Sequence, residues 1–352
     1  MPDWSKSMQQ TFEYYIVDPK TWCDSTQITT ITSCSITRDS TVDTLGSASI
    51  ELTENIGEEY VRVYLVTIQN GVKERYSLGT FLVQTPSTKF DGKSTSITLD
   101  AYTPLLELKE NMPPIGFTVL KNSTTMTQVY NLTREHLRAP VVEPAGSATL
   151  YSDFTAETND TWLTYLSDLA ADARYSFDLD ELSRVIFQPY TKTASLQPRY
   201  TFTDDNSSIL YPEVTVERDL YNIPNAVEVV YTDSNHSLYA KAVNSEKNSP
   251  ISTVNRGREI LYRITDPELK GVPDETYIKN YAEQVLSDQS TLEYTLSYTH
   301  AYCPVRVGDC VLLNYRAAGL SNVKAKIVSQ TIKCEPGTPV TEKAVYTQNL
   351  WR

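Results

Sequence analysis

Glycine is scarce in this sequence, and the glycine patterns that bind phosphate are missing. The chain has 12 glycines among 352 residues. Neither G-x-x-x-x-G-K-[ST] nor a strand-linked G-x-G-x-x-G occurs, so no loop is expected to place backbone N–H groups around a nucleotide phosphate. The nucleophile pattern G-x-S-x-G is missing as well. These absences argue against nucleotide-dependent enzymes and α/β-hydrolases.

Cysteine and long apolar runs are also sparse. The five cysteines stand at 23, 34, 303, 310 and 334, and no two have C-x-x-C spacing. A zinc ribbon or a redox pair is therefore not expected. We expect free thiols in a reducing compartment instead. No apolar run approaches about 18 residues, and the start MPDWSKSMQQTFEYY lacks an apolar core. We expect neither a signal peptide nor stable membrane insertion.

Histidine occurs three times, and none of the three stands in a metal or catalytic pattern. His136 is expected at a helix end, His236 in a polar turn and His300 in a strand. None belongs to an H-E-x-x-H or H-x-E arrangement. Surface or interface packing is the favoured interpretation for each.

Two groups of carboxylates could suggest chemistry. Asp178, Asp180 and Glu181 could form a glycosidase pair, but they fall at a predicted hairpin tip, where such residues are ordinary. The run Asp204–Asn206 could suggest calcium, yet the fuller D-x-[DN]-x-[DN]-G loop is missing. Gly308–Asp309 predicts a tight turn before an apolar strand. We therefore expect no enzyme activity, with no catalytic, cofactor-binding or metal residue and no cofactor.

The charge and aromatic content favour assembly over DNA reading. The chain has 44 acidic against 31 basic residues, a formal charge of −13, and its Lys and Arg are scattered. Counterion release can then supply little affinity, so duplex DNA should bind weakly. An acidic wall would suit a conduit through which nucleic acid slides. The 24 tyrosines against 8 phenylalanines favour half-buried sheets and protein interfaces.

The first hundred residues are typical of short strands. Alternating segments cover 28–38, 46–55 and 60–68, and Asn70–Gly71 predicts a hairpin turn. The chain returns through 75–85, and another strand is expected at 96–102. Pro104, Pro113 and Pro114 mark a boundary after this β-rich part.

Helical periodicity appears next. The segment 124–137 has one apolar face, with Thr125 and Gln128 at capping-box spacing. A second helix is expected over 158–173, capped by Thr158 or Asn159, with Trp162 leading its apolar stripe. A hairpin follows over 175–188 and turns at Asp180–Ser183.

From about 195 the pattern returns to strands. One helix is expected after Pro273–Asp274. The predicted strands of this part cover 226–233, 237–244, 258–264, 291–302, 305–315, 323–334 and 342–351. The fold class is thus mainly β with an α+β insert: two β-barrel-like tube domains, 1–112 and 196–352, flank a helix-containing module, 113–195. This division allows the last domain to be discontinuous with the module.

Several segments in this order resemble the hub proteins at the tip of bacteriophage tails. The segments are VRVYLVTI, SLGTFLVQTPS, SITLDAYTPLLEL, NDTWLTYLSDLAADARYSFDLDELSRVIFQP and PVRVGDCVLLNY. The resemblance covers about 28–350, and its weight lies in the combination. It implies a homotrimer in which each chain contributes two similar β-barrels, so that six barrels adapt a six-fold tube to a three-fold tip.

The resemblance also implies partners and a location. The neighbours would be a distal tail or tail-tube protein, a tape-measure protein and a spike- or fibre-bearing tip protein, with transient, non-specific passage of DNA. The protein would be made in the host bacterial cytoplasm and act in the virion tail tip. Many such proteins continue into a peptidoglycan-cutting domain, whereas this sequence stops at Arg352 after its last predicted strand. No lysin activity is therefore expected.

Two alternatives remain open. One is a carbohydrate- or receptor-binding module of the tail tip, which would need exposed aromatic platforms. The four tryptophans are Trp4, Trp22, Trp162 and Trp351, and Trp162 is expected in a helix core. The other is a tail-associated hydrolase.

Overall fold

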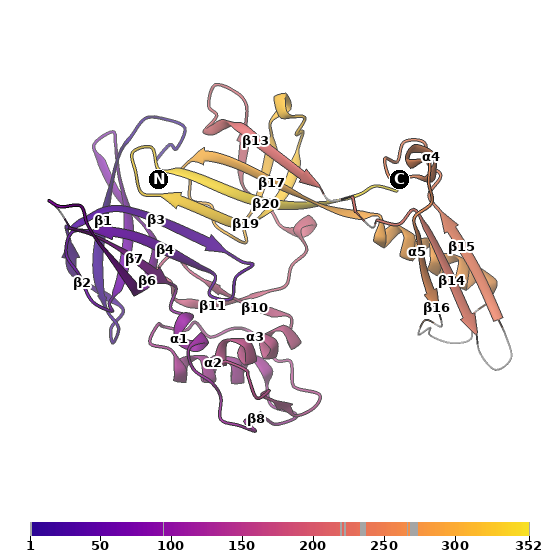
Figure 1. Ribbon diagram of the computed structural model, residues 1–352, viewed down its shortest axis with the longest axis horizontal. Helices are drawn as coiled ribbons and strands as arrows, with labels where there is room; N and C mark the ends of the chain where they lie inside the picture. Colours follow the sequence, from indigo (N-terminus) through magenta and orange to yellow (C-terminus); the bar gives the residue numbers. More distant parts are fainter. Residues whose placement is uncertain are drawn as a thin grey trace. The chain divides into compact units, whose positions relative to one another are not determined.

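The chain forms two compact units in the computed structural model (Figure 1), which describes residues 2–93, 95–218, 220–221, 223–232, 237–265, 267 and 274–351. Unit 1 comprises Met1–Val214 and Ser297–Ala344. Unit 2 comprises Thr215–Leu296 and Val345–Arg352. Three strands contain the boundaries between them: β13 (Leu210–Arg218), β17 (Thr291–Ala301) and β20 (Pro339–Asn349).

Most of unit 1 is one large, mainly antiparallel sheet. Its strand order is β13-β17-β20-β19-β3-β4-β7-β6-β5-β1-β2, and β18 pairs with both β12 and β19. Its other strands are β1 (Gln9–Asp18), β2 (Cys23–Ile28), β3 (Ile31–Asp39), β4 (Gly46–Leu52), β5 (Tyr60–Gln69), β6 (Val72–Phe90), β7 (Thr95–Tyr102), β12 (Pro198–Thr203), β18 (Cys310–Asn314) and β19 (Val323–Lys333). The short helices η1 (Thr193–Ser195) and η2 (Arg316–Ala318) lie in its connections. The mainly β fold class with some helix is confirmed.

Local sequence explains the first hairpin of this sheet. Asn70 and Gly71 both have positive φ, 52° and 79°. A two-residue hairpin turn of this type needs that conformation at both positions, and Asn-Gly adopts it most readily. The turn fixes the register in which Gln69 faces Val72. The predicted hairpin is confirmed.

The strands from the two ends of the chain meet where β19 pairs with β3. Ser329 faces Asp39 and Lys333 faces Ser35 in an antiparallel register. Ile36 and Ile332, opposite each other there, are fully buried and belong to one apolar core. Burial of that face fixes the register, because a slip by one residue would turn these side chains to solvent.

A small helical module sits within unit 1. It contains α1 (Leu106–Lys109), β8 (Thr118–Val119), α2 (Thr125–His136), β9 (Phe154–Thr155), α3 (Trp162–Asp172), β10 (Tyr175–Leu179) and β11 (Val185–Pro189). Its core is shared with Trp22, Tyr60 and Leu82 from the large sheet. The Trp22 indole N–H donates to Leu182 O at 2.9 Å, so the hairpin turn is docked on that sheet.

The N-caps of α2 and α3 are other residues than the expected ones. Thr124, not Thr125, caps α2 without a side-chain hydrogen bond, and the Thr125 N–H donates instead to Ala148 O at 2.9 Å. The capping-box prediction was wrong, because a neighbouring segment satisfies that donor. Thr161 caps α3 by accepting from Thr164 N, whereas residues 157–160 form a turn before the helix.

Unit 2 has a three-stranded sheet with a helix on one face. β14 (Ala226–Thr232) pairs antiparallel with β15 (Ser237–Val243) and parallel with β16 (Leu261–Thr265). α5 (Glu275–Gln289) buries Ile278, Ala282 and Leu286 against this sheet, and the short α4 (Thr253–Arg256) precedes β16. Asp274 caps α5 by accepting from Tyr277 N at 2.7 Å, and α5 begins directly after it, where the sequence predicts a helix.

Two strands of the structure were not predicted from the sequence, and the predictions for two segments and for the domain division remain untested. β1 and β2 were not expected as strands, because their segment lacks a strict alternation of apolar residues. Pro273 and His236, with the polar turn around it, lie outside the described residues. The borders of the two units differ from the three ranges expected, and the three-domain division remains a prediction.

Candidate functional site

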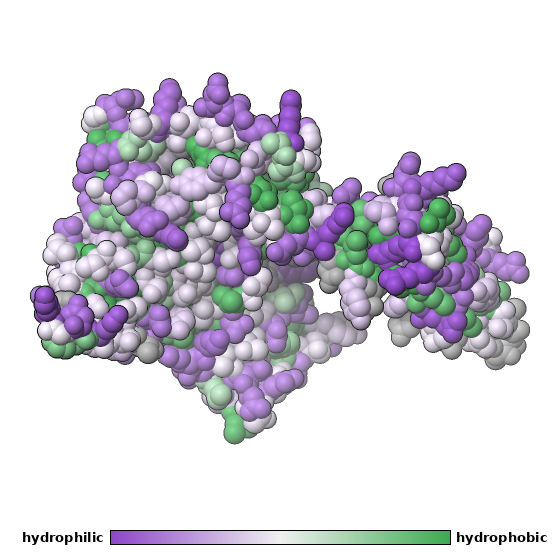
Figure 2. Space-filling view, turned by 45° about the horizontal axis from the view of Figure 1, so that its top comes forward, coloured by the Kyte–Doolittle hydropathy of each residue, from purple (hydrophilic) through white to green (hydrophobic). Residues whose placement is uncertain are grey.

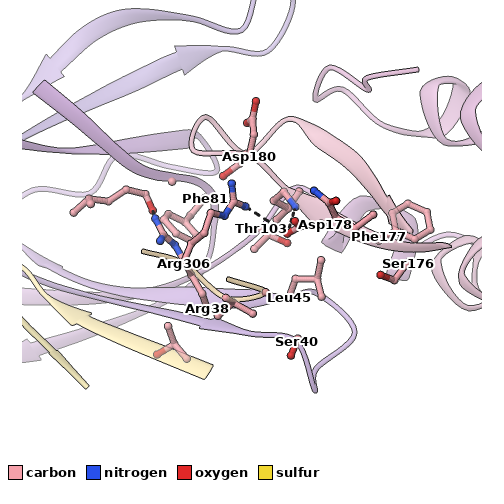
Figure 3. Close-up of a pocket in the computed structure, with 18 of the residues that line it drawn as sticks. Arg38, Ser40, Leu45, Phe81, Thr103, Ser176, Phe177, Asp178, Asp180 and Arg306 are labelled. Carbon is pink, nitrogen blue, oxygen red and sulfur yellow. Dashed lines mark hydrogen bonds and ion pairs between the residues drawn. The ribbon is translucent and has the colours of Figure 1, made fainter. Parts of the chain in front are cut away.

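A cleft of unit 1 lies between the β10–β11 hairpin and the turn at residues 304–309, and we call it the hairpin cleft. Figure 3 shows its smaller part. The cleft has a wider part of about 420 Å³ and an adjoining inner cavity of about 130 Å³. Arg306 lines both parts. Its guanidinium donates to Glu181 at 3.3 Å and to Asp178 at 3.4 Å. One cation thus holds the hairpin carboxylates against the later turn.

Burial and charge act on these carboxylates in opposite directions. Burial raises the pKa of Asp178 above its usual value, although Arg306 opposes the rise. Burial also acts to raise the pKa of Glu181. A backbone hydrogen bond and the charge of Arg306 outweigh this effect, so the pKa of Glu181 is lowered. The two acids face the same cation and form an ion triplet, which differs from the facing pair that hydrolyses glycosides.

Asp180 has a turn role, as its sequence position indicates. Its Oδ1 accepts from Leu182 N at 3.0 Å and from Arg184 N at 2.8 Å. The Ser183 hydroxyl in this turn accepts from Thr80 N of the large sheet at 2.7 Å. The hairpin tip therefore fixes the module to the sheet.

The later turn has the geometry expected of Gly308–Asp309. Gly308 has φ of +93°, a conformation that favours glycine. The Asp309 carboxylate accepts from Arg306 N at 3.0 Å, and the Asp309 N–H donates to Arg306 O at 3.0 Å. This prediction is confirmed.

A buried polar network was missed by sequence reasoning. Glu342 is fully buried and accepts from Tyr298 Oη at 2.6 Å and from Gln330 Nε2 at 2.7 Å. Gln330 Oε1 in turn accepts from the Arg38 guanidinium at 2.9 Å. In β20 every second residue is buried at Val340, Glu342 and Ala344. This alternation in the sequence is the signal that could have predicted a buried Glu342.

His300 joins the same network and is fully buried. Its Nδ1 donates to Ala301 O at 2.7 Å, because a carbonyl can only accept. Its Nε2 lies 3.3 Å from Glu342 Oε1, an ion-pair distance, but makes no hydrogen bond within the described residues. His136 instead stacks on the Trp162 ring, with centroids 4.1 Å apart.

The residues considered for calcium have local partners. Asp204 accepts from the backbone N–H of Arg316, the first residue of η2, at 2.9 Å, while Asp205 accepts from Ser207 N at 2.8 Å. Within the described ranges, no group of three or more His, Cys, Asp or Glu side chains could hold a metal ion. The expectation that the protein needs no metal stays a prediction.

The cysteines allow a direct labelling prediction. Cys23 is exposed, whereas Cys34, Cys303 and Cys310 are buried and all are free thiols. Burial raises the pKa of the Cys303 and Cys310 thiols, which suppresses the reactive thiolate. We expect iodoacetamide to modify Cys23 first in the native protein, and the three buried thiols only after unfolding, as measured by peptide mass spectrometry. Rapid labelling of Cys303 before unfolding would contradict its placement.

Asp309 predicts a pH effect on stability. Burial raises the pKa of its carboxyl in the folded state above the unfolded value. Its favourable contribution is therefore present at acid pH and is lost as pH rises through the folded pKa. The Asp309→Asn side chain can still accept from Arg306 N but cannot take up a proton. As pH falls from 7 to 4.5, we therefore expect its melting temperature to rise less than that of the wild type. If the melting temperatures of the two proteins change by the same amount across this range, the raised pKa of Asp309 is wrong.

The fold found above is that of phage tail proteins. The structure of a tail protein from Neisseria meningitidis matches with a TM-score of 0.63 at 12% identity, covering 97% of this chain and 98% of that one. A 43 kDa tail protein of prophage MuSo2 from Shewanella oneidensis matches with a TM-score of 0.59 at 13% identity, covering 96% and 98%. The expected family resemblance is confirmed at the level of fold. No protein-family model matches the sequence, and neither does any curated protein.

In the described part of the chain, no helix is both long and apolar enough to cross a membrane. Exposed apolar side chains do occur, among them Ile115 and Tyr151 of the helical module, each 91% exposed. On the face drawn in Figure 2, apolar residues are scattered among hydrophilic ones.

Proposed function

We propose that this chain is a structural hub of a phage tail tip, acting in the virion after synthesis in the host cytoplasm. The observation that carries the proposal is a match to two tail-protein structures over at least 96% of the chain. A match of that extent includes the strands of both chain ends and the helical module between them. The coarser proposal, a structural role in a tail, is supported by this shared fold through analogy.

The finer proposal is a homotrimeric ring that closes the tail tube and adapts six-fold to three-fold symmetry. The pairing of β3 with β19 supports this proposal. It joins strands from the first and the last part of the chain in one sheet, so the sheet has an early and a late half. Three such chains would give six β-rich parts. The formal charge of −13 suits a channel wall past which DNA slides without sticking.

The proposed partners follow from that position. A distal tail or tail-tube protein would lie above the ring, a tape-measure protein inside it and a spike- or fibre-bearing protein below. No catalytic or cofactor residue is proposed. The ion triplet of Arg306 and the turn role of Asp180 support a structural interpretation of the residues that sequence alone made candidates.

Negative-stain imaging of the purified protein, alone and with its tail neighbours, tests the proposal. A ring with three-fold symmetry supports the hub. Two assays address the alternatives: cleavage of peptidoglycan would indicate a tail-associated hydrolase, and selective binding on a glycan array would indicate a carbohydrate- or receptor-binding module. Either result without ring formation in the presence of the neighbours would overturn the hub role.

A further inference from the structure

Two cysteines from the first and the last part of the chain are neighbours in the sheet of unit 1. β3 and β19 pair in an antiparallel register in which Lys333 faces Ser35 (Figure 1), and the next positions of that register are Cys334 and Cys34. The pairing continues there, because the Cys334 N–H donates to Cys34 O at 2.9 Å. The two cysteines are therefore directly opposite each other, with their side chains on the same face of the sheet. Local C-x-x-C spacing does not predict this pair, because the fold brings together residues far apart in the sequence.

The separation of such a pair suits a disulfide bond. The Cα atoms of a hydrogen-bonded antiparallel pair lie about 5.5 Å apart, and disulfides join Cα atoms that are about 4.4–6.8 Å apart. Cys34 and Cys334 are free thiols and pack in one apolar core. The pKa of the Cys34 thiol is raised, first by the neighbouring Cys334 thiol and then by burial. The two side chains thus interact without being bonded.

The two thiols differ in their access to solvent. Cys34 is only 6% exposed. Cys334 is half-buried and follows directly on the last residue of β19, and residues 335–337 after it are exposed. Cys334 is therefore the thiol that a small reagent meets first, and Cys34 can react with the product from within the sheet.

We propose that Cys34 and Cys334 are a redox modification site, at which a low-molecular-weight disulfide such as oxidised glutathione converts the two thiols into a disulfide bond. The Cys334 thiolate attacks one sulfur of the reagent, so a mixed disulfide forms and one glutathione thiolate leaves. The Cys34 thiolate then attacks the Cys334 sulfur, which forms the protein disulfide and releases the second glutathione thiolate. Two protein thiols are oxidised, one glutathione disulfide is reduced to two thiols, and the protons of the cysteines pass to the two glutathiones.

The bond would tie the early strands of the sheet to the late ones. It closes a loop of about 300 residues, and a cross-link over a long loop stabilises the folded state by restricting the unfolded chain. The chemistry requires only the cysteine pair and does not rest on the hub role. If the hub role holds, the chain leaves the reducing cytoplasm with the virion, and oxidation follows its release.

The test uses the full chain with Cys23→Ser, which removes an exposed thiol and keeps both sulfurs of the pair. The native protein is reduced with a phosphine, freed of it and incubated with oxidised glutathione. Remaining thiols are trapped with iodoacetamide in urea, and the chain is digested without reduction. We expect mass spectrometry to find the peptides of Cys34 and Cys334 linked, and the melting temperature to rise by about 5 °C or more. Renewed reduction should reverse both changes.

Two further variants locate the bond. Cys334→Ser in the same background removes the pair, so oxidised glutathione should produce neither the link nor the rise in melting temperature. Cys310→Ser is the matched control, because it removes a buried thiol outside the pair and should leave both results unchanged.

Three results of the Cys23→Ser experiment would overturn the proposal, whether or not the further variants fold. They are a Cys334 that remains in the mixed disulfide with glutathione, a link that forms only in urea, and the absence of any link. A linked protein that melts no higher than the reduced one also counts against it, because the bond would then not fit the native sheet. A three-fold ring without the linked peptide would overturn this inference alone and leave the hub role standing.

Discussion

Replacing Trp162 by alanine is expected to lower the free energy of unfolding by about 3–5 kcal/mol. The side chain is only 3% exposed and lies at the start of α3. Its ring packs edge-on against Phe117, with ring centroids 5.0 Å apart, and stacks on His136, with centroids 4.1 Å apart. The substitution leaves a cavity that these neighbours cannot fill without moving. Urea denaturation followed by circular dichroism measures the loss.

Tyr151→Ala is the control for this prediction. Tyr151 belongs to the same module but is 91% exposed, so its removal should change stability by no more than about 0.5 kcal/mol. If Trp162→Ala unfolds at the wild-type urea concentration, the burial of α3 against the module is wrong.

Removing the Glu342 carboxylate is expected to cost about 3–5 kcal/mol in Glu342→Ala. The hydroxyl of Tyr298 and the amide of Gln330 would lose their acceptor in a fully buried place, and His300 Nε2 would lose the carboxylate oxygen that lies 3.3 Å from it. Glu342→Gln keeps one acceptor oxygen and should cost less, about 1–3 kcal/mol. Thermal and urea denaturation should rank the wild type above the Gln variant and the Gln variant above the Ala variant.

Glu335→Ala provides the comparison, since Glu335 is an exposed acid between β19 and β20. It should be nearly neutral. A Glu342→Ala protein as stable as Glu335→Ala would show that the buried network adds nothing to the sheet. Should Glu342→Ala fail to accumulate as folded protein, the milder Gln variant still decides the question.

Local patterns predicted much of this fold because their causes are local. Asn70–Gly71 determined a hairpin through backbone conformation alone, and the apolar stripe of α3 follows from helical period. Helix starts were less predictable, because Thr125 N is satisfied by Ala148, which lies 23 positions along the chain. The joining of β3 to β19 depends on residues nearly 300 positions apart, and no local pattern encodes such a pairing.

The site was harder to foresee than the fold. The turn role of Asp180 follows from its neighbours, but the ion triplet needs Arg306, which lies more than 120 positions from Asp178. Glu342 stands in an alternating strand where a polar residue at a buried position is unusual. Its partners Tyr298 and Gln330 come from two other strands, so only the folded sheet reveals that it is satisfied.

A reconstruction of the assembled tail particle tests the hub assignment most directly. We expect three copies of this chain in one closed ring, in which the two β-rich parts of each chain together make six similar positions around the axis. Polar and acidic side chains should line the channel. One or six copies per ring, or two β-rich parts with unrelated folds, would contradict it.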